Sequence, residues 1–215
     1  MFDVTAGTGV LVISRGLSTG EVVRAAHLLC TVGITAMEVT MDSPGAVESI
    51  ETLAREMEGQ MLVGAGTVLT RAELVAAKDA GAKFIICPHF DPVLVRAAAE
   101  AGLPIVPGAL TPTEILAAWE AGAAAVKVFP AVTMGPDYIK QLRGPLGFIP
   151  LLPTGGITAD NARSFVAAGA FGVAVGGGLM SSRLRSDAGL FKQEAARLLA
   201  AVREGRGHGG EQAGA

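Results

Sequence analysis

Seven glycines divide the chain into units of similar length and constrain its fold more than any other feature of the sequence. Each glycine closes a segment with a helical pattern and opens an apolar, strand-like segment, and successive glycines are 20 to 26 residues apart. They are Gly33, Gly59, Gly81, Gly102, Gly122, Gly147 and Gly169. A glycine after the last helical residue readily takes the left-handed conformation that ends a helix, and a continuous apolar run is typical of a strand buried on both faces. The repeating unit of helix, glycine and strand predicts an α/β protein with a parallel sheet.

With one further strand near the start, the pattern predicts eight strands alternating with eight helices. Strands are expected at 10–14, 36–40, 61–65, 83–87, 104–106, 125–129, 150–153 and 171–175. Helices are expected near 19–31, 44–58, 70–80, 91–101, 111–121, 136–143, 158–168 and 188–204. The expected N-caps are Ser18, Thr70, Asp91, Thr111 and Thr158.

This count is typical of a closed (β/α)8 TIM barrel, which we expect to form a single domain over residues 1–204. The glycine-rich segment 205–215 has no apolar periodicity and is predicted to be a disordered C-terminal tail. An open doubly wound sheet is the alternative fold. It usually carries Gly-x-Gly-x-x-Gly at the start of a helix, and no such motif opens a helix here.

The composition favours small-molecule chemistry. Half of the residues are hydrophobic, and the net charge of −3 with a pI near 5.6 gives no basic surface for nucleic acid and no sign of membrane binding. The start of the chain lacks the pattern of a signal peptide. The two cysteines, Cys30 and Cys87, show no metal-like or disulfide-like spacing. These features predict a cytoplasmic protein.

Lys127 is the only charged residue in the apolar run 123–130. Burial disfavours the ammonium form of a lysine, so such a side chain can supply a neutral amine near neutral pH. A neutral amine attacks a ketone and forms a Schiff base, which then acts as an electron sink. The alternative is a lysine on an edge strand that extends its ammonium group into water.

Glu38 lies in the second expected strand and is the acidic counterpart of Lys127. A buried carboxylate needs a partner or a task, and we expect the two side chains to meet inside the barrel. Glu38 is then a candidate general acid and base that moves protons during Schiff-base chemistry. The alternative is a structural ion pair that only fills the interior.

Glycine-rich segments follow three of the expected strands. Residues 64–67 (Gly-Ala-Gly-Thr) end the third strand with little side-chain bulk, so that backbone amides and Thr67 could approach a carboxylate; the alternative is a simple tight turn. Residues 154–157 and 176–178 follow the last two strands, where such barrels often bind phosphate. Flexible turns without a ligand are the alternative there.

The histidines do not indicate a metal site. His27 lies in an expected helix and His208 in the expected tail, which leaves only His89 near the strand ends. One histidine among scattered acids is poor support for zinc or manganese. We therefore expect neither a metal nor another cofactor.

Eight short motifs occur in the order found in a known enzyme family. They are Arg15-Gly16, Glu38-Val-Thr40, Gly64-Ala-Gly-Thr-Val68, Ile86-Cys-Pro-His89, Val106-Pro-Gly108, Lys127-Val-Phe-Pro130, Gly135-Pro136 and Pro153-Thr-Gly-Gly156. With these motifs the chain resembles the 2-keto-3-deoxy-6-phosphogluconate (KDPG) aldolases, whose members often also cleave 4-hydroxy-2-oxoglutarate (KHG). The resemblance spans roughly residues 10 to 180 and implies a (β/α)8 barrel.

The resemblance also implies a role for individual residues. Lys127 would form a Schiff base with pyruvate without a metal, and Glu38 would be the general acid and base. Thr67, with Arg15 and Gly66, would hold the carboxylate of a 2-keto acid. The phosphate would lie on Gly155, Gly156, Gly176 and Gly177, and the pocket would include Thr154, Pro88 and Phe129. The family implies a homotrimer.

Two positions depart from the family pattern. Asp42-Ser43-Pro44 replaces an Arg-Thr pair of many members, and an aspartate cannot pair with a carboxylate or a phosphate. Related phosphogalactonate aldolases have a similar Asn-Ser-Pro, so the preferred sugar acid could differ. Gly178 stands where some members have a serine that helps to bind phosphate, so phosphate affinity could be lower.

Two other functions stay open at the level of sequence. A phosphate-binding barrel isomerase or epimerase would use the same glycine loops without needing the amine of Lys127. A noncatalytic sugar-phosphate sensor would bind the same ligands without releasing pyruvate. The pattern of residues does not decide between gluconate and galactonate substrates.

Overall fold

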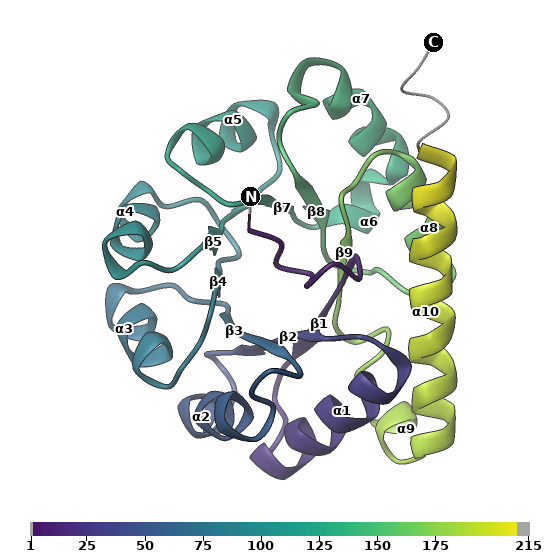
Figure 1. Ribbon diagram of the computed structural model, residues 1–215. Helices are drawn as coiled ribbons and strands as arrows, with labels where there is room; N and C mark the ends of the chain where they lie inside the picture. The colour runs from purple at the N-terminus through teal and green to yellow at the C-terminus, as the bar shows by residue number, and fades with distance from the viewer. Residues whose placement is uncertain (1, 210–215) are drawn as a thin grey trace.

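The computed structural model describes residues 2–209, without the side chains of residues 183, 184, 208 and 209. Strands and helices alternate along the chain, and the helices lie outside a central ring of strands (Figure 1). The strands are β1 (Val10–Ser14), β2 (Ala36–Thr40), β3 (Leu62–Gly66), β4 (Ile85–Ile86), β5 (Ile105–Val106), β6 (Gly108–Ala109), β7 (Val126–Val128), β8 (Leu151–Pro153) and β9 (Val173–Val175). The helices are α1 (Thr19–Val32), α2 (Ala46–Glu56), α3 (Arg71–Asp79), α4 (Pro92–Ala101), α5 (Pro112–Glu120), α6 (Ala131–Met134), α7 (Pro136–Leu146), α8 (Ala162–Ala167), α9 (Ser182–Arg185) and α10 (Ala188–Gly209).

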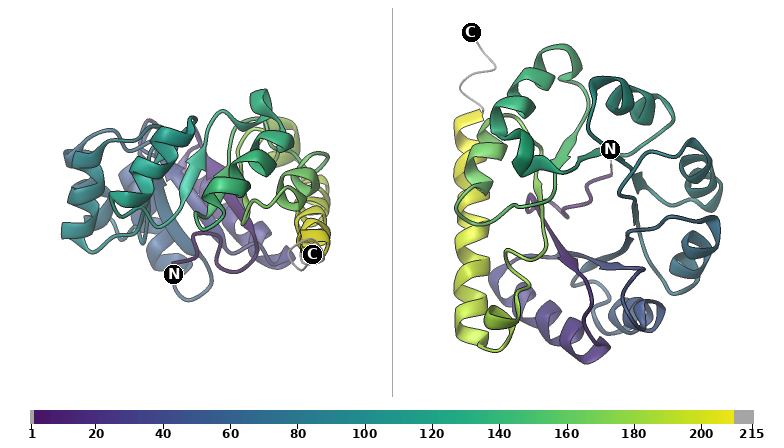
Figure 2. Two further views of the ribbon diagram at one scale, coloured as in Figure 1. Left: turned by 90° about the horizontal axis from the view of Figure 1, so that it is seen from above. Right: turned by 180° about the vertical axis from the view of Figure 1, so that it is seen from behind.

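The strands form two parallel sheets, with the orders β5-β4-β3-β2-β1-β9 and β6-β7-β8. Thr154 and Ala174 form a parallel bridge between the two sheets, and the amide of Phe171 donates to the carbonyl of Leu151 at 3.2 Å. On the other side, β5 and β6 are separated only by Pro107. The view from behind shows the same arrangement of helices around strands (Figure 2).

The sequence pattern predicts eight strands in one barrel, and residues 2–209 form nine strands in two sheets. The additional strand arises at Pro107. Proline has no N–H to donate to a neighbouring strand, so the ladder is interrupted there although its carbonyl accepts from the amide of Lys127 at 2.9 Å.

The hydrophobic core has two parts. The larger part lies between the strands and the surrounding helices, and the smaller part lies among side chains that point to the inside of the ring. The smaller cluster includes Val4, Leu11 and Phe84, with Phe2 packed against it. The segment that carries Phe2 and Val4 crosses the centre of the ring in Figure 1. The N-terminal segment therefore helps to fill the interior at the amino ends of the strands.

Most helix ends follow the sequence pattern. Thr70, Asp91 and Thr111 accept hydrogen bonds from backbone amides of their helices, and Ser18 is the N-cap of α1. Thr158 is not a cap, because α8 begins only at Ala162 and the side chain of Asn161 accepts from the Thr158 amide instead. Of the seven glycines in the repeat, all but Gly147 have positive φ.

The last helix is longer than predicted. Residues 205–209 belong to α10, so the expectation of disorder from residue 205 is wrong for that part, and residues 210–215 lie outside the described part. Helix α10 packs against α8 and α1. Arg206 donates to the carbonyls of Gly7 and Phe171, both at 2.8 Å. These tertiary contacts stabilise a glycine-rich helical end that local propensity does not favour.

Two short helices, α6 and α9, were not expected from the sequence. None of the helices within residues 2–209 combines the length and apolar character needed to cross a bilayer.

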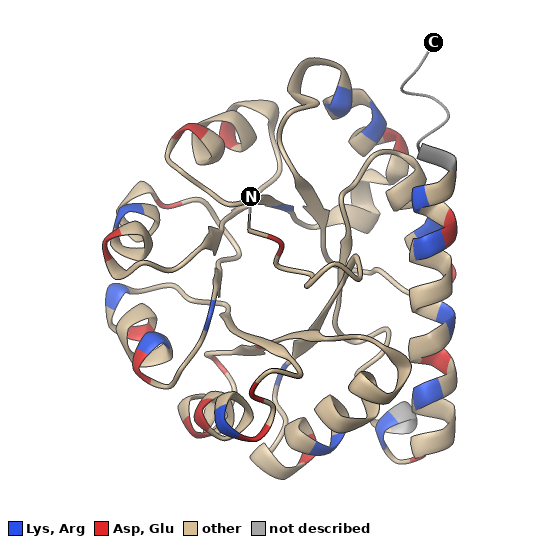
Figure 3. Cartoon of the chain, viewed as in Figure 1, with Lys and Arg blue, Asp and Glu red and all other residues tan. Residues whose placement is uncertain are grey.

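Charged residues lie mainly on the helices (Figure 3). Within the nine strands, only Glu38 and Lys127 are charged.

Candidate active site

Glu38 in β2 and Lys127 in β7 point to the inside of the ring. Strand side chains alternate between faces, and Ala36 and Ala125, each two residues earlier, belong to the interior cluster. Only 1% of Glu38 and 5% of Lys127 are exposed. Because β7 lies between β6 and β8, the alternative of an edge-strand lysine that reaches into water is wrong.

The two buried groups shift each other's ionisation. Burial lowers the pKa of the Lys127 ammonium below its ordinary value, and the charge of Glu38 partly opposes this. Burial raises the pKa of the Glu38 carboxyl, and the charges of Lys127 and Arg15 oppose this. Among the described residues, Glu38 and Lys127 do not form an ion pair with each other. Glu38 Oε2 also has no hydrogen-bond partner in the described protein. The arrangement favours a neutral amine beside a carboxyl group that is free to exchange protons.

The glycines of β3 leave room for these interior side chains. A Cβ atom at Gly66 would lie 2.3 Å from Oε1 of Glu38, and one at Gly64 would lie 2.3 Å from the Phe84 ring. Gly66 is therefore needed for the position of the catalytic candidate Glu38. This role differs from the predicted contact with a substrate carboxylate, which stays a prediction.

Thr67 and Arg15 lie together beyond the ends of β3 and β1. The Nη2 group of Arg15 donates to Thr67 Oγ1 at 2.8 Å, and its Nη1 group forms an ion pair with Asp42. Thr67 has a positive φ of 55°, which is uncommon for a residue with a side chain. The structure thus brings together the two side chains predicted to hold a carboxylate, and adds Asp42 to them.

The two glycine loops after β8 and β9 also meet. A Cβ atom at Gly178 would lie 2.6 Å from the backbone oxygen of Ile157, so a serine at position 178 would require a shift of the backbone. Gly155 and Gly156 have φ values of 93° and 76°, a region that favours glycine. Gly177 has open space around its Cα, and Gly176 faces Ile13. These loops leave backbone accessible at neighbouring strand ends, as a phosphate site requires.

The three predicted pocket residues differ in exposure. The ring centroid of Phe129 lies 5.1 Å from Lys127 Nζ, and 40% of this residue is exposed. Thr154 is buried, and its hydroxyl donates to the carbonyl of Leu152 at 3.1 Å. Pro88 is half-buried and its backbone packs against Gly108. Phe129 is the one that contacts the amine and also reaches the surface.

Cys87 is a second nucleophile close enough to feel the charges of Lys127 and Glu38. Burial raises the pKa of its thiol to about 12. A thiol with this pKa stays protonated and unreactive at neutral pH. Lys127 is therefore the better nucleophile of the two.

Within residues 2–209, no group of three or more His, Cys, Asp and Glu side chains is placed to hold a metal ion. His89 is exposed. The absence of a metal cofactor stays a prediction.

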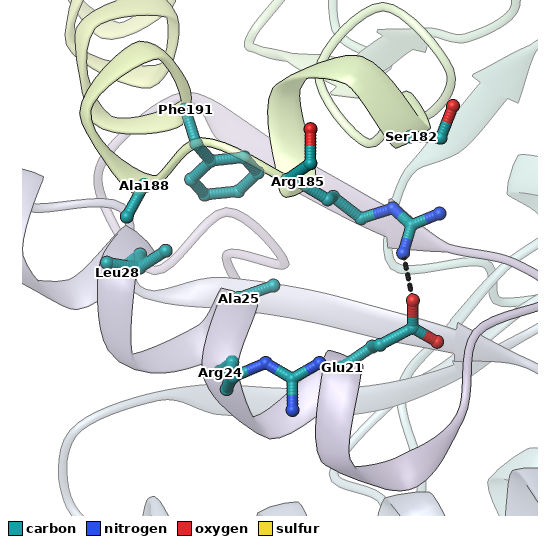
Figure 4. A pocket seen from close by; sticks show the side chains of 9 residues that line it. Glu21, Arg24, Ala25, Leu28, Ser182, Arg185, Ala188 and Phe191 are labelled. Atoms are coloured by element: carbon teal, nitrogen blue, oxygen red, sulfur yellow. Dashed lines mark hydrogen bonds and ion pairs between the residues drawn. The ribbon is translucent and has the colours of Figure 1, made fainter.

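A separate cavity lies between α1 and the helices α9 and α10 (Figure 4). Its lining includes Glu21, Arg24, Arg185 and Phe191, and none of the predicted site residues. Glu21 and Arg185 form an ion pair across it at 2.5 Å. The cavity therefore does not contain the chemistry assigned to Lys127.

Comparison with known proteins places this geometry in a family. Residues 7–193 match the family model described as KDPG and KHG aldolase. The chain belongs to this aldolase family. Within it, a probable 2-dehydro-3-deoxy-6-phosphogalactonate aldolase of Rhizobium meliloti (strain 1021) is 36% identical over 89% of this chain and 90% of the relative.

Two solved structures are similar to this aldolase family member over nearly its whole length. A structure described as native KDPGal has a TM-score of 0.86 and 31% identity, covering 91% of this chain and 95% of the other. The KDPG aldolase of Legionella pneumophila has a TM-score of 0.82 and 25% identity, covering 88% and 93%. That enzyme was captured with pyruvate as a covalent carbinolamine intermediate.

Sequence reasoning missed the network around Asp42 in this aldolase. Ser43 Oγ accepts from the amide of Gly16 at 2.8 Å and shares a hydrogen bond with Thr40 Oγ1 at 2.9 Å. These contacts hold the loop after β2 against the loop after β1. The only available signal was that both loops follow neighbouring strands, because no local pattern joins residues 27 positions apart.

Proposed function

We propose that the protein is a class I aldolase that reversibly cleaves a 2-keto-3-deoxy-6-phospho sugar acid to pyruvate and glyceraldehyde 3-phosphate. The observation that carries the proposal is the buried Lys127 amine, with a lowered pKa, facing the same interior as Glu38, whose Oε2 has no hydrogen-bond partner among the described residues. Membership of the aldolase family and the covalent pyruvate adduct of the Legionella relative support it.

The reaction starts at the C2 ketone of the substrate. Neutral Lys127 Nζ attacks C2, and the carbinolamine loses water to give an iminium ion. The C3–C4 bond breaks as its electrons move toward the iminium nitrogen, while Glu38 accepts the proton of the C4 hydroxyl. Glyceraldehyde 3-phosphate leaves, the remaining enamine is protonated at C3, and water releases pyruvate from Lys127.

Substrate binding uses groups at the carboxyl ends of the strands. Thr67 and Arg15 bind the carboxylate next to the ketone, and Gly66 leaves room for Glu38 beside them. The phosphate lies on the backbone of Gly155, Gly156, Gly176 and Gly177. Neither a metal nor another cofactor takes part. The names of the Rhizobium relative and of the native KDPGal structure favour the galactonate epimer as the first substrate to test.

A pyruvate-release assay coupled to lactate dehydrogenase tests the function. The substrates to test are the gluconate and galactonate epimers of the 2-keto-3-deoxy-6-phospho sugar acid, their dephosphorylated forms and 4-hydroxy-2-oxoglutarate. We expect release from at least one phosphorylated sugar acid and none from Lys127→Ala. The matched control is Lys83→Ala, because Lys83 is exposed just before β4. Binding without pyruvate release would indicate a sensor, and isomerisation without release would indicate an isomerase or epimerase.

We further propose that residues 1–204 form one closed (β/α)8 domain in which β5 and β6 count as a single strand interrupted at Pro107. The contacts of Thr154 with Ala174 and of Phe171 with Leu151 support closure.

We also propose that the protein is a cytoplasmic homotrimer. The free cysteines are compatible with a reducing compartment, and large apolar side chains stay exposed at Leu69, Val75 and Val93. Light scattering of the purified protein tests the trimer.

A further inference from the structure

Asp42 is the partner of Arg15 at the mouth of the ring, and the proposed mechanism gives it no role. Its carboxylate accepts from Nη1 of Arg15, while Nη2 of the same guanidinium donates to Thr67 Oγ1 at 2.8 Å. One planar guanidinium therefore joins the loops that follow β1, β2 and β3, and these three strands are neighbours in the sheet.

Stability does not account for this pair. The side chains of Arg15 and Asp42 are 56% and 46% exposed, and exposed ion pairs contribute little to folding because water and salt screen them. Hydrogen bonds of Ser43 with the Gly16 amide and with Thr40 already hold the same two loops together.

The position of the guanidinium matters for the reacting groups. The charge of Arg15 acts on the pKa of both Glu38 and Lys127, so it lies close to the centre of the site. Without an acceptor on its other edge, a long exposed arginine would sample many rotamers. An acceptor that selects one rotamer in advance lowers the entropy lost when a carboxylate binds.

We propose that Asp42 is a positioning residue that holds the Arg15 guanidinium on Thr67, so that the carboxylate end of a 2-keto acid meets a preassembled pair. This inference rests on the proposed function, because it takes a 2-keto acid as the ligand. Asp42 acts through Arg15 and does not touch the substrate carboxylate, which its own charge would repel.

The test measures how much pyruvate is needed for half-maximal trapping of the protein by borohydride. Asp42→Ala should raise this concentration about 10-fold, which corresponds to roughly 1.4 kcal/mol. Asp42→Asn keeps an oxygen that accepts from Arg15 and should raise it by only about 2- to 3-fold. In the aldol reaction, KM should rise more than kcat falls.

A double-mutant cycle separates positioning from a merely structural effect. If Asp42 acts through Arg15, the double variant with both Arg15→Ala and Asp42→Ala should bind pyruvate no more weakly than the single variant Arg15→Ala. The matched control is Glu100→Ala, which removes the similarly exposed ion pair with Arg71. It should leave the pyruvate concentration for half-maximal trapping unchanged. Thermal melting should show all variants folded.

Half-saturation of Asp42→Ala equal to or below the wild-type value would overturn the inference, as would additive effects in the cycle. Either result, with normal trapping of the wild type, would leave the proposed function intact. A wild-type protein that forms no pyruvate adduct would contradict the proposed function itself, and the inference with it.

Discussion

The two ends of the strand ring differ in what fills them. At the amino ends, Phe2, Val4, Leu11 and Phe84 form an apolar cluster. Toward the carboxyl ends, inward-facing positions carry Glu38 and Lys127, and a carboxylate oxygen of Glu38 lacks a partner in the described protein. One interior is thus divided along the strand axis into an apolar part that stabilises the fold and a part that carries the groups proposed to perform the chemistry.

The comparison makes its largest prediction for Lys127. Lys127→Met should reduce turnover at least about 1,000-fold, which corresponds to roughly 4 kcal/mol of activation free energy, because the nucleophile is lost. Folding stability should be unchanged or higher, since a similar apolar side chain avoids the cost of burying an amine. Steady-state kinetics and chemical denaturation measure the two effects. Substantial remaining turnover would show that the carboxyl end is not the reacting end.

The opposite end should show the opposite effect. Phe84→Ala removes a fully buried ring and should lower the free energy of unfolding by about 3 to 5 kcal/mol. Turnover per folded molecule should stay close to that of the wild type. Phe148→Ala is the control, because Phe148 is 58% exposed and its removal should cost little. A loss of turnover without a loss of stability would break the division between the two ends.

Glu38 is the second residue toward the carboxyl ends whose substitution should lower turnover. Glu38→Gln should lower turnover by about 100-fold or more, because the amide cannot accept the C4 hydroxyl proton, while stability changes little. Glu51→Gln, at an exposed position on α2, is the matched control. Unchanged turnover would reduce Glu38 to a filler of the interior.

The smallest effect, a pH-dependent change in stability, is expected at Glu21. This residue belongs to neither end of the strand ring and lies beside the separate cavity of Figure 4. Hydrogen bonds from Ser18 and Arg185 lower the pKa of Glu21 to about 2. A carboxylate with a depressed folded pKa contributes stability above its unfolded pKa, and this contribution is lost as the pH falls through the folded value. Melting temperatures of the wild type and of Glu21→Gln should therefore differ above about pH 4.5 and converge toward pH 2. A constant difference across this range would contradict the assignment.

The sequence was sufficient for features that depend on local pattern. The glycine repeat indicated most strands and helices, and a single charge within an apolar run was enough to single out Lys127 and Glu38. Features that depend on tertiary contacts were missed. The sequence presents Asp42 as a group unable to bind an anion, whereas its contact with Arg15 depends on how two loops lie side by side. Likewise, helix α10 continues to Gly209, and Arg206 near its end contacts the carbonyls of Gly7 and Phe171, which are distant in sequence.

If the buried amine of Lys127 is the nucleophile, pyruvate should become covalently attached to this lysine. The protein is incubated with pyruvate and borohydride, digested, and analysed by mass spectrometry of its lysine peptides. We expect a reduced pyruvate adduct on Lys127, with the other lysines unmodified. An adduct on a different lysine, or none at all, would contradict it.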